Sequence, residues 1–348
     1  MRDRASLVVV NYRARTMHAT QMMSLPSLKQ LDCIARTLTS QYGEDWRLLP
    51  TLLGAAAARY HTSGRTSGGR FVELGAYQGT DLSNSLLLER CYNWTGVLIE
   101  ANPNNFAVLR TAGRRARLVH SAVCEGDGSS GTTVPITVNG LAVSGQVGAM
   151  SETYILHERR GDNISDVVHV NCRSLASIIR PESHRYDFLS LDVEGAEDKV
   201  LKTVDPSIFG VIMVEDDGYD KNKQDRVDRA INAAGLRRAK QLAVPRSGVY
   251  LRSDVREVPS WSGLPLYRGH CGAPTVAQQC EQDAPKRSVD LSSCVRLCRT
   301  ACRDCRFVSF WKGGCSFHAD CGSRTRPYPY AGGWISLNVS AWESDPDA

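Results

Sequence analysis

The sequence contains no hydrophobic run long enough to cross a membrane and has little excess charge of either sign. The longest apolar stretch near its start, Leu7 to Val10, is followed at once by polar Asn11 and Tyr12, whereas a membrane span needs about 18–20 apolar residues. The 42 Lys and Arg residues barely exceed the 37 Asp and Glu residues, so the basic excess typical of nucleic-acid-binding proteins is missing. We expect no transmembrane segment in this chain and no nucleic-acid partner.

Extreme composition is also absent. A hydrophobic content of 42% and a charged content of 23% argue against wholesale disorder, collagen and coiled coil. Four cysteines are scattered through the first 262 residues, whereas eight lie between Cys271 and Cys321. This asymmetry marks a domain boundary. We expect an N-terminal helical segment (1–66), a main domain (67–256), a linker (257–265) and a cysteine-rich module (266–348).

Short apolar runs alternate with helical patterns between Arg70 and Ser253. The strand candidates are Phe71–Leu74, Val97–Ile99, Leu118–Val119, Phe188–Leu191 and Val211–Val214. The helix candidates are Leu82–Cys91, Phe106–Ala112, Ala196–Val204 and Arg226–Ala234, preceded by apolar spacing at 28–38 and 46–60. Such alternation predicts an α/β fold with a mainly parallel, doubly wound sheet. An antiparallel pair, Leu236–Leu242 with Val249–Leu251, is expected at one edge, and a hairpin at 126–138 with a glycine-rich lid at 140–148.

A carboxylate and two glycines follow the first predicted strand. Glu73, Gly75 and Gly79 precede a helix expected near Thr80, and glycine lets a backbone turn sharply and approach a ligand. Glu100 ends the second strand 25 residues after Gly75, where a carboxylate can accept hydrogen bonds from both ribose hydroxyls. The spacing is not G-x-G-x-x-G. An adenosine-type ligand is favoured over a dinucleotide, although both acids also suit ordinary loops.

A second acidic group follows the fourth and fifth predicted strands, at the edge where open α/β sheets bind ligands. It comprises Asp192, Glu194, Glu197 and the run Glu215–Asp217. Neighbouring carboxylates repel, so one can act as a proton acceptor or the group can hold a cation. Capping of a helix start is the simpler role for Glu197. A divalent-metal site built from Asp192, Glu215 and Asp216 is conceivable, but no histidine or spacing fixes it, and we predict no metal.

Three separated motifs resemble the FkbM-type S-adenosylmethionine-dependent methyltransferases over about residues 70–253. They are Phe71–Ser85, Trp94–Pro103 and Leu189–Glu197. The resemblance implies a Rossmann-like methyltransferase sheet, S-adenosylmethionine as cofactor and an O-methyltransferase reaction. Tyr77 and Ser85 depart from the pattern, since a small polar residue and a threonine are common there.

The same resemblance implies particular site residues. Those expected at the cofactor are Glu73, Gly75, Ala76, Tyr77, Gly79, Glu100, Ala101, Ser121 and Ala122, with Glu100 on the ribose and the last two at the adenine. Methyl transfer mainly requires an aligned nucleophile and a base for its proton. The candidate catalytic residues are Asp192, Glu194 and His120, although a lone histidine at a strand end is more often structural. His157 and His184 have no evident partner.

The cysteine-rich tail predicts a small scaffold held by disulfides. Cys294, Cys298 and Cys302 recur at helical spacing on one face, and eight cysteines in so short a segment suit disulfides. A zinc site using Cys302, Cys305 and Cys315 with His318 or Cys321 is the alternative; we favour disulfides. The segment also resembles apple or PAN-type modules, which implies carbohydrate or protein binding.

Three Asn-x-Ser/Thr sequons begin at Asn93, Asn163 and Asn338, and they are compatible with a secretory route. No signal-like core follows Met1, so we expect an incomplete start and a location in the secretory lumen or outside the cell. The sequence then favours O-methylation of a hydroxyl on a glycan or glycoconjugate. The alternative is a non-catalytic binding or trafficking protein that retains the methyltransferase fold. Nothing in the sequence fixes the oligomeric state.

Overall fold

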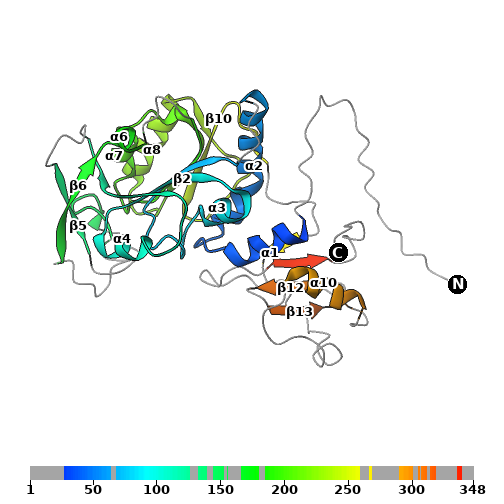
Figure 1. Cartoon of the computed structure of the whole chain (residues 1–348). Helices are drawn as coiled ribbons and strands as arrows, with labels where there is room; N and C mark the ends of the chain where they lie inside the picture. Colours follow the sequence, from blue (N-terminus) through cyan, green and yellow to red (C-terminus); the bar gives the residue numbers. More distant parts are fainter. Residues whose placement is uncertain are drawn as a thin grey trace.

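The computed structural model describes residues 27–63, 68–125, 132–138, 144–152, 155, 166–179, 185–258, 266–268, 290–300, 305, 307–311, 314–318 and 335–338. A large α/β body and a small sheet with one helix lie on either side of the first helix (Figure 1). Among these residues no helix combines the length and the apolar character that crossing a membrane requires.

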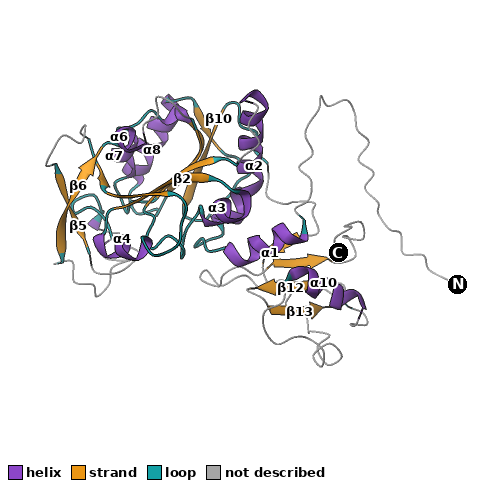
Figure 2. Ribbon diagram, viewed as in Figure 1, coloured by secondary structure: helices purple, strands orange, loops and turns teal. Residues whose placement is uncertain are grey.

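The large body is built on a seven-stranded sheet of order β3-β2-β1-β7-β8-β10-β9 (Figure 2). The first five strands are parallel, and β10 runs antiparallel to both of its neighbours. This confirms the doubly wound sheet and the antiparallel edge pair predicted from the sequence. The strands span β1 Arg70–Leu74, β2 Thr95–Glu100, β3 Arg117–His120, β7 Tyr186–Leu191, β8 Phe209–Glu215, β9 Leu236–Arg238 and β10 Ser247–Arg252.

Helices cover both faces of this sheet because its central strands alternate apolar side chains to either side. Phe71 of β1 packs in one core cluster with Leu49 and Leu87, while neighbouring Val72 packs in another with Val227. The first face carries α2 (Glu44–Ser63), α3 (Leu86–Tyr92) and α4 (Pro103–Leu109); the second carries α6 (Leu175–Ile179), α7 (Glu197–Leu201) and α8 (Lys221–Ala233), with a 3₁₀ turn, η2 (Pro206–Ile208), before β8.

The loop after β1 is longer than expected. α3 begins at Leu86 and not near Thr80 or Leu82, because Leu82 has a φ of 62°, outside the helical region. The Ser83 hydroxyl then accepts hydrogen bonds from the backbone N–H groups of Ser85 and Leu86. The start of α3 is thus capped by its own chain.

A second, three-stranded sheet replaces the predicted hairpin. β5 (Thr133–Thr137) pairs antiparallel with β6 (Val167–Arg173), a strand that the sequence did not reveal, and β6 pairs parallel with β4 (Ala122–Val123). A disulfide between Cys124 and Cys172 joins β4 to β6. The glycine-rich segments 126–131 and 139–143 lie outside the described residues.

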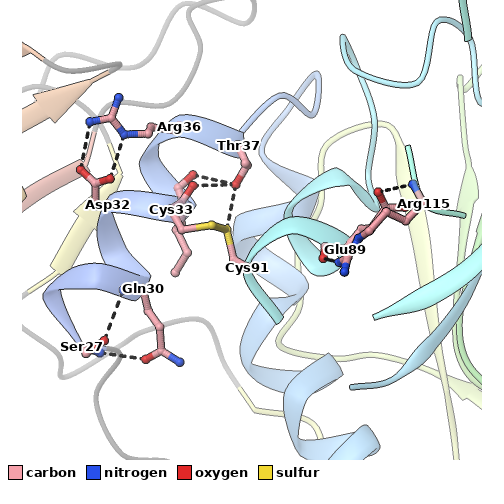
Figure 3. The surroundings of a disulfide bond; sticks show 10 residues. Ser27, Gln30, Asp32, Cys33, Arg36, Thr37, Glu89, Cys91 and Arg115 are labelled. Atoms are coloured by element: carbon pink, nitrogen blue, oxygen red, sulfur yellow. Dashed lines mark hydrogen bonds and ion pairs between the residues drawn. A yellow bond between two sulfur atoms is a disulfide. The ribbon is translucent and has the colours of Figure 1, made fainter. Parts of the chain in front are cut away.

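The first helix, α1 (Leu28–Thr37), is tied covalently to the large body (Figure 3). Its start is fixed by a capping box between Ser27 and Gln30. Cys33 of α1 forms a disulfide with Cys91 of α3, and the Thr37 hydroxyl lies 3.3 Å from the Cys91 sulfur. α1 is therefore part of the main domain's framework.

The opposite face of α1 carries the cysteine-rich module. Val295 and Phe310 of that module belong to the same core cluster as Leu31 of α1, and the Leu291 N–H donates to Asp32 Oδ1 at 3.0 Å. The module contains α10 (Leu291–Thr300) and a sheet of order β11-β14-β12-β13, made of Leu266–Arg268, Ile335–Asn338, Phe307–Trp311 and Gly314–His318. α1 thus joins the two parts of the chain.

The described cysteines of this module form disulfides and are therefore not free to bind zinc. Cys294 pairs with Cys315, and Cys298 pairs with Cys305. Two of the residues that the zinc alternative required, Cys305 and Cys315, are thereby used. Cys302, the third cysteine of the predicted helical face, lies outside the described residues together with Cys271, Cys280 and Cys321.

Removal of the Cys33–Cys91 disulfide should destabilise the protein. The bond closes a loop with a sequence separation of 58, and the chain-entropy model assigns such a loop about 4 kcal/mol. A Cys33→Ser/Cys91→Ser variant should unfold at lower urea concentration than the wild type. Equal urea midpoints for the two proteins would show that α1 is not held through this bond.

Candidate functional site

A cavity lies at the carboxyl edge of the seven-stranded sheet. The ends of β1, β2, β7 and β8 line it, together with residues that follow β3 and the segment 144–146. About 1290 Å³ of this region, open mouth included, is not filled by protein atoms. Such crevices at the carboxyl ends of parallel strands are where open α/β sheets bind ligands.

The turn after β1 forms the floor of the cavity. The N–H groups of Gly75 and Ala76 both donate to the carbonyl of Ile99 at 3.1 Å, and the Asp192 N–H donates to the Leu74 carbonyl. Gly75 has a φ of +73°, and a Cβ there would lie 1.8 Å from the Asp192 carbonyl oxygen. Only glycine allows the β1 and β7 ends to approach this closely.

Glu100 lies at the end of β2 with its carboxylate in the cavity wall. Its Oε2 accepts a hydrogen bond from the Tyr77 N–H at 2.8 Å, and its Oε1 accepts one from the Asn102 N–H at 2.7 Å. Burial raises the pKa of Glu100 to about 7, although these hydrogen bonds act in the opposite direction. The Ala101 N–H and the Asn105 side chain also form hydrogen bonds with this carboxylate.

Glu73 also lines the cavity, but its carboxylate is bound to the chain itself. Its Oε1 accepts from the Asn84 N–H at 2.8 Å, and its Oε2 accepts from the hydroxyls of Ser83 and Ser85. Arg114 donates to both of these hydroxyls and to the Gly79 carbonyl. Glu73 therefore holds the 79–85 loop in place, which corrects the expectation that its carboxylate binds the cofactor.

The other residues expected at the cofactor divide into two groups. Gly75, Tyr77, Glu100, Ala101, Ser121 and Ala122 line the cavity. Ala76 and Gly79 do not: Ala76 is buried, and a Cβ on Gly79 would lie 2.3 Å from a methyl of Leu109. These two residues shape the turn from behind.

Three carboxylates meet at the other end of the cavity. Asp192 and Glu194 follow β7, Glu215 ends β8, and one oxygen of each lies within 4.8 Å of the others. Burial is the main cause that raises the pKa of Asp192 and of Glu215, and neighbouring carboxylates raise both further. Such groups suit proton acceptance or cation binding.

The remaining acids of the two motifs have other partners. Glu197 Oε1 accepts from the N–H groups of Val193 and Gly195, and its Oε2 lies 2.9 Å from Lys223 Nζ. Lys223 also pairs with Asp217 at 3.3 Å, and Asp216 pairs with Arg238 at 3.4 Å. Glu197 caps the turn before α7, as expected, and Asp216 does not join the carboxylate cluster.

His120 lies away from the cavity. Its ring stacks on Phe106, with ring centroids 4.8 Å apart, and its Nε2 lies 3.1 Å from the Ala101 carbonyl oxygen. It is exposed and does not line the cavity. We therefore assign it no catalytic role, since a base must reach the reacting group. His157 and His184 lie outside the described residues.

The mouth of the cavity contains polar residues that the sequence did not single out. They come from the segment between α1 and α2, the first residue of α2, the loop before α3, the 144–146 segment and the residue before β10. They are Gln41, Glu44, Asn84, Ser144, Gln146 and Arg246. A smaller pocket next to Asp192 and Glu215 is lined by Tyr42 with four of them.

The strand order and the cavity with its acid after the second strand define a Rossmann-like methyltransferase domain. Residues 73–237 match the family model of the methyltransferase FkbM domain. This match supports the resemblance to S-adenosyl-L-methionine-dependent methyltransferases of the FkbM type that the sequence motifs predicted for this part of the chain.

Solved structures with similar folds include other methyltransferases. The methyltransferase FkbM from Methylobacillus flagellatus is 14% identical, with 64% of this chain and 58% of that chain covered and a TM-score of 0.33. A TehB-like S-adenosylmethionine-dependent methyltransferase from Corynebacterium glutamicum is 12% identical, with coverages of 57% and 87% and a TM-score of 0.27. Aeropyrum pernix fibrillarin, solved with natively bound S-adenosyl-L-methionine, is 13% identical, with coverages of 57% and 75% and a TM-score of 0.28. No curated protein sequence matches the chain.

The residues of the cavity fit S-adenosyl-L-methionine. Glu100 presents a buried carboxylate in the cavity wall at the end of β2, which suits the ribose hydroxyls. Gly75 lines the same cavity, and its lack of a Cβ lets the turn lie against the Asp192 carbonyl. The donor set therefore matches a nucleoside at the Glu100 end and a reacting group at the Asp192 end.

Proposed function

We propose that the chain transfers a methyl group from S-adenosyl-L-methionine to a hydroxyl of a glycan or glycoconjugate. The observation that carries this proposal is a single cavity with Glu100 at one end and Asp192 at the other. A ligand-binding carboxylate and a cluster of proton-accepting carboxylates thus face one continuous space. A binding protein without catalysis needs no such cluster.

The chain's own residues provide binding at one end. Glu100 accepts hydrogen bonds from the ribose hydroxyls. The Tyr77 N–H donates to the same carboxylate and fixes its orientation. Ala101, Ser121 and Ala122 form the wall next to Glu100, where we place the adenine. The Ser121 hydroxyl donates to the Ala122 and Asn171 carbonyls, which holds this wall in position.

The carboxylates at the other end accept a proton. When bound, S-adenosyl-L-methionine supplies a methyl group on positively charged sulfur, so that the donor needs no further activation. An acceptor hydroxyl would lose its proton to Asp192 or Glu194 as its oxygen gains the methyl group. The electron pair of the broken S–CH3 bond would stay on sulfur, and S-adenosyl-L-homocysteine would leave. The raised pKa of Asp192, caused mainly by burial, suits it to this role.

The polar mouth supports an acceptor with many hydroxyl groups. Gln41, Asn84 and Gln146 offer both donors and acceptors there. Glu44 lines the same region together with the Asp192 cluster, and these acids disfavour phosphate or carboxylate groups on the acceptor. A neutral glycan hydroxyl fits this environment.

The disulfides support a location in the secretory lumen or outside the cell. Every described cysteine is paired, both in the main domain and in the cysteine-rich module. Disulfides persist in oxidising compartments and are rare in the cytosol. Glycoconjugates are abundant along this route, and we propose that the module helps to hold the acceptor.

A panel of glycans incubated with the chain and methyl-labelled S-adenosyl-L-methionine tests the proposal. We expect label on at least one glycan and a roughly 100-fold or greater loss with Asp192→Asn, since general-base catalysis contributes about 10²–10⁴-fold. Binding of S-adenosyl-L-methionine to both proteins, measured by calorimetry, shows that the cavity is intact. Equal background label with both proteins would instead favour the non-catalytic binding or trafficking role.

A further inference from the structure

The three carboxylates at the ends of β7 and β8 form a preassembled oxygen-ligand set. β7 and β8 are adjacent parallel strands, paired through Leu191 and Val214. Asp192 and Glu215 directly follow these paired residues, so the two carboxyl groups leave neighbouring strand ends at the same level. Glu194, with a φ of +57° in the turn before α7, brings the third oxygen within 4.8 Å.

Apart from a proton shared between Asp192 and Glu215, two oxygens of these carboxyl groups have no donor in the described part of the protein. Asp192 Oδ1 and Glu215 Oε2 are buried atoms that accept no hydrogen bond. When both groups are ionised, neither can donate to the other, so each needs a proton or a cation. An unsatisfied buried carboxylate oxygen costs free energy, and here two of them share one small space.

Lys223, whose charge acts on Asp192, has other carboxylate partners. Lys223 pairs with Glu197 and Asp217. Arg246 lines the same cavity, and its Nη1 lies 3.4 Å from the Tyr42 hydroxyl. Glu44 adds a further carboxylate to the cavity wall. The described part of the cavity thus carries more acidic than basic side chains.

We propose that Asp192, Glu194 and Glu215 bind a divalent cation of the kind that prefers oxygen ligands, such as Mg²⁺, Mn²⁺ or Ca²⁺. Carboxylates from two strand ends and one turn match this preference. The cluster borders both the large cavity and the smaller pocket at its mouth. The inference rests on the proposed function in one respect: during methyl transfer, the acceptor hydroxyl would be a further oxygen ligand of the cation.

Cation binding is compatible with proton acceptance. Each carboxylate has two oxygens, and the site uses one from each residue. A cation that binds the acceptor oxygen lowers the pKa of that hydroxyl, and a carboxylate oxygen not on the cation can take the released proton. The cation would also fix where the acceptor oxygen lies.

Titration of the untagged full chain with Mn²⁺, followed by the paramagnetic resonance signal of free Mn²⁺, tests this site without an acceptor. We expect one bound Mn²⁺ per chain, displaced by excess Mg²⁺ or Ca²⁺. Asp192→Asn and Glu215→Gln should each weaken Mn²⁺ binding at least tenfold. Glu194→Gln, in the turn before α7, should do the same with less risk to the fold.

Asp216→Asn is the matched control, because Asp216 is the next residue after Glu215 but pairs with Arg238. It should bind Mn²⁺ like the wild type. A wild type that binds no Mn²⁺, or equal binding by all variants, would overturn the metal site. Calorimetry with S-adenosyl-L-methionine in the presence of EDTA separates the two proposals: cofactor binding without any Mn²⁺ binding rejects this inference alone.

Discussion

Replacement of Glu100 by Gln is expected to weaken S-adenosyl-L-methionine binding by roughly 10- to 100-fold, since hydrogen bonds to a charged group contribute about 1.5–3 kcal/mol. The amide keeps one acceptor oxygen but loses the charge and the second acceptor. Calorimetry at pH 8 measures the effect. Glu125→Gln, at an exposed position, is the matched control and should leave the affinity unchanged.

The same residue predicts a pH dependence. The ribose hydroxyls donate to the ionised carboxylate, and burial raises the pKa of Glu100 to about 7. The wild-type affinity should therefore fall about 30-fold between pH 8.5 and pH 5.5, whereas the affinity of Glu100→Gln should change little. A wild-type affinity that does not change with pH would show that Glu100 does not contact the cofactor.

Without cofactor, the free energy of unfolding should fall as the pH rises, whereas the cofactor affinity should increase. Because the pKa of Glu100 is higher in the folded chain than the ordinary value of 4.5, its ionisation costs folding free energy as the pH rises from 4.5 through 7. From pH 4 to pH 8, the unfolding free energy of the wild type should fall by ~3 kcal/mol relative to that of Glu100→Gln. Urea unfolding at the two pH values measures this shift.

Gly75→Ala should abolish cofactor binding and lower the unfolding temperature. The new Cβ would lie 1.8 Å from the Asp192 carbonyl oxygen, so the turn after β1 must move away from β7. The left-handed φ adds about 1–2 kcal/mol for any residue with a Cβ. We expect a loss in affinity of roughly 100-fold or more, because the turn carries the Tyr77 N–H that orients Glu100.

Gly148→Ala separates the steric effect from the backbone effect. Gly148 has a φ of +77°, close to that of Gly75, but a Cβ there meets no atom within 4 Å. This variant should show only the φ cost and should bind the cofactor normally. Equal losses in the two variants would mean that the approach of β1 to β7 does not shape the site.

The main sheet could be predicted from the sequence because its strands are buried on both faces. Val211–Val214 is a continuous apolar run, and Phe188–Leu191 is interrupted only by Ser190; such runs identify central parallel strands. The alternation with helices then fixed the class of fold. The positions of Glu100 at the end of β2 and Asp192 after β7 were predictable for the same reason, since both follow from where the strands end.

The second sheet could not be predicted in the same way. β6 reads Val-Val-His-Val-Asn-Cys-Arg, in which only Val170 and Cys172 are buried, and its partner β5 lies some 30 residues earlier in the chain. Periodicity gives no partner for such a strand. The pairing of Cys124 with Cys172 would have revealed it, but the sequence does not give disulfide connectivity.

The partners of individual acids were the least predictable feature. Glu73 and Glu100 both follow apolar strand residues, yet the hydroxyls of Ser83 and Ser85 engage only Glu73. The contact of both serines with Glu73 requires Leu82 to adopt a non-helical φ. The composition of 82–91 instead favours a helix that starts at Leu82. Arg246 and Gln41 reach the cavity from segments about 200 residues apart, and only the fold brings them together.

A crystal structure of the full chain with S-adenosyl-L-homocysteine tests the central claim most directly. We predict that the two ribose hydroxyls lie within hydrogen-bond distance of the Glu100 carboxylate, with the sulfur toward Asp192 and the adenine beside Ser121. A ligand bound elsewhere, or a cavity closed by the chain's own side chains in crystals that contain the ligand, would contradict this account.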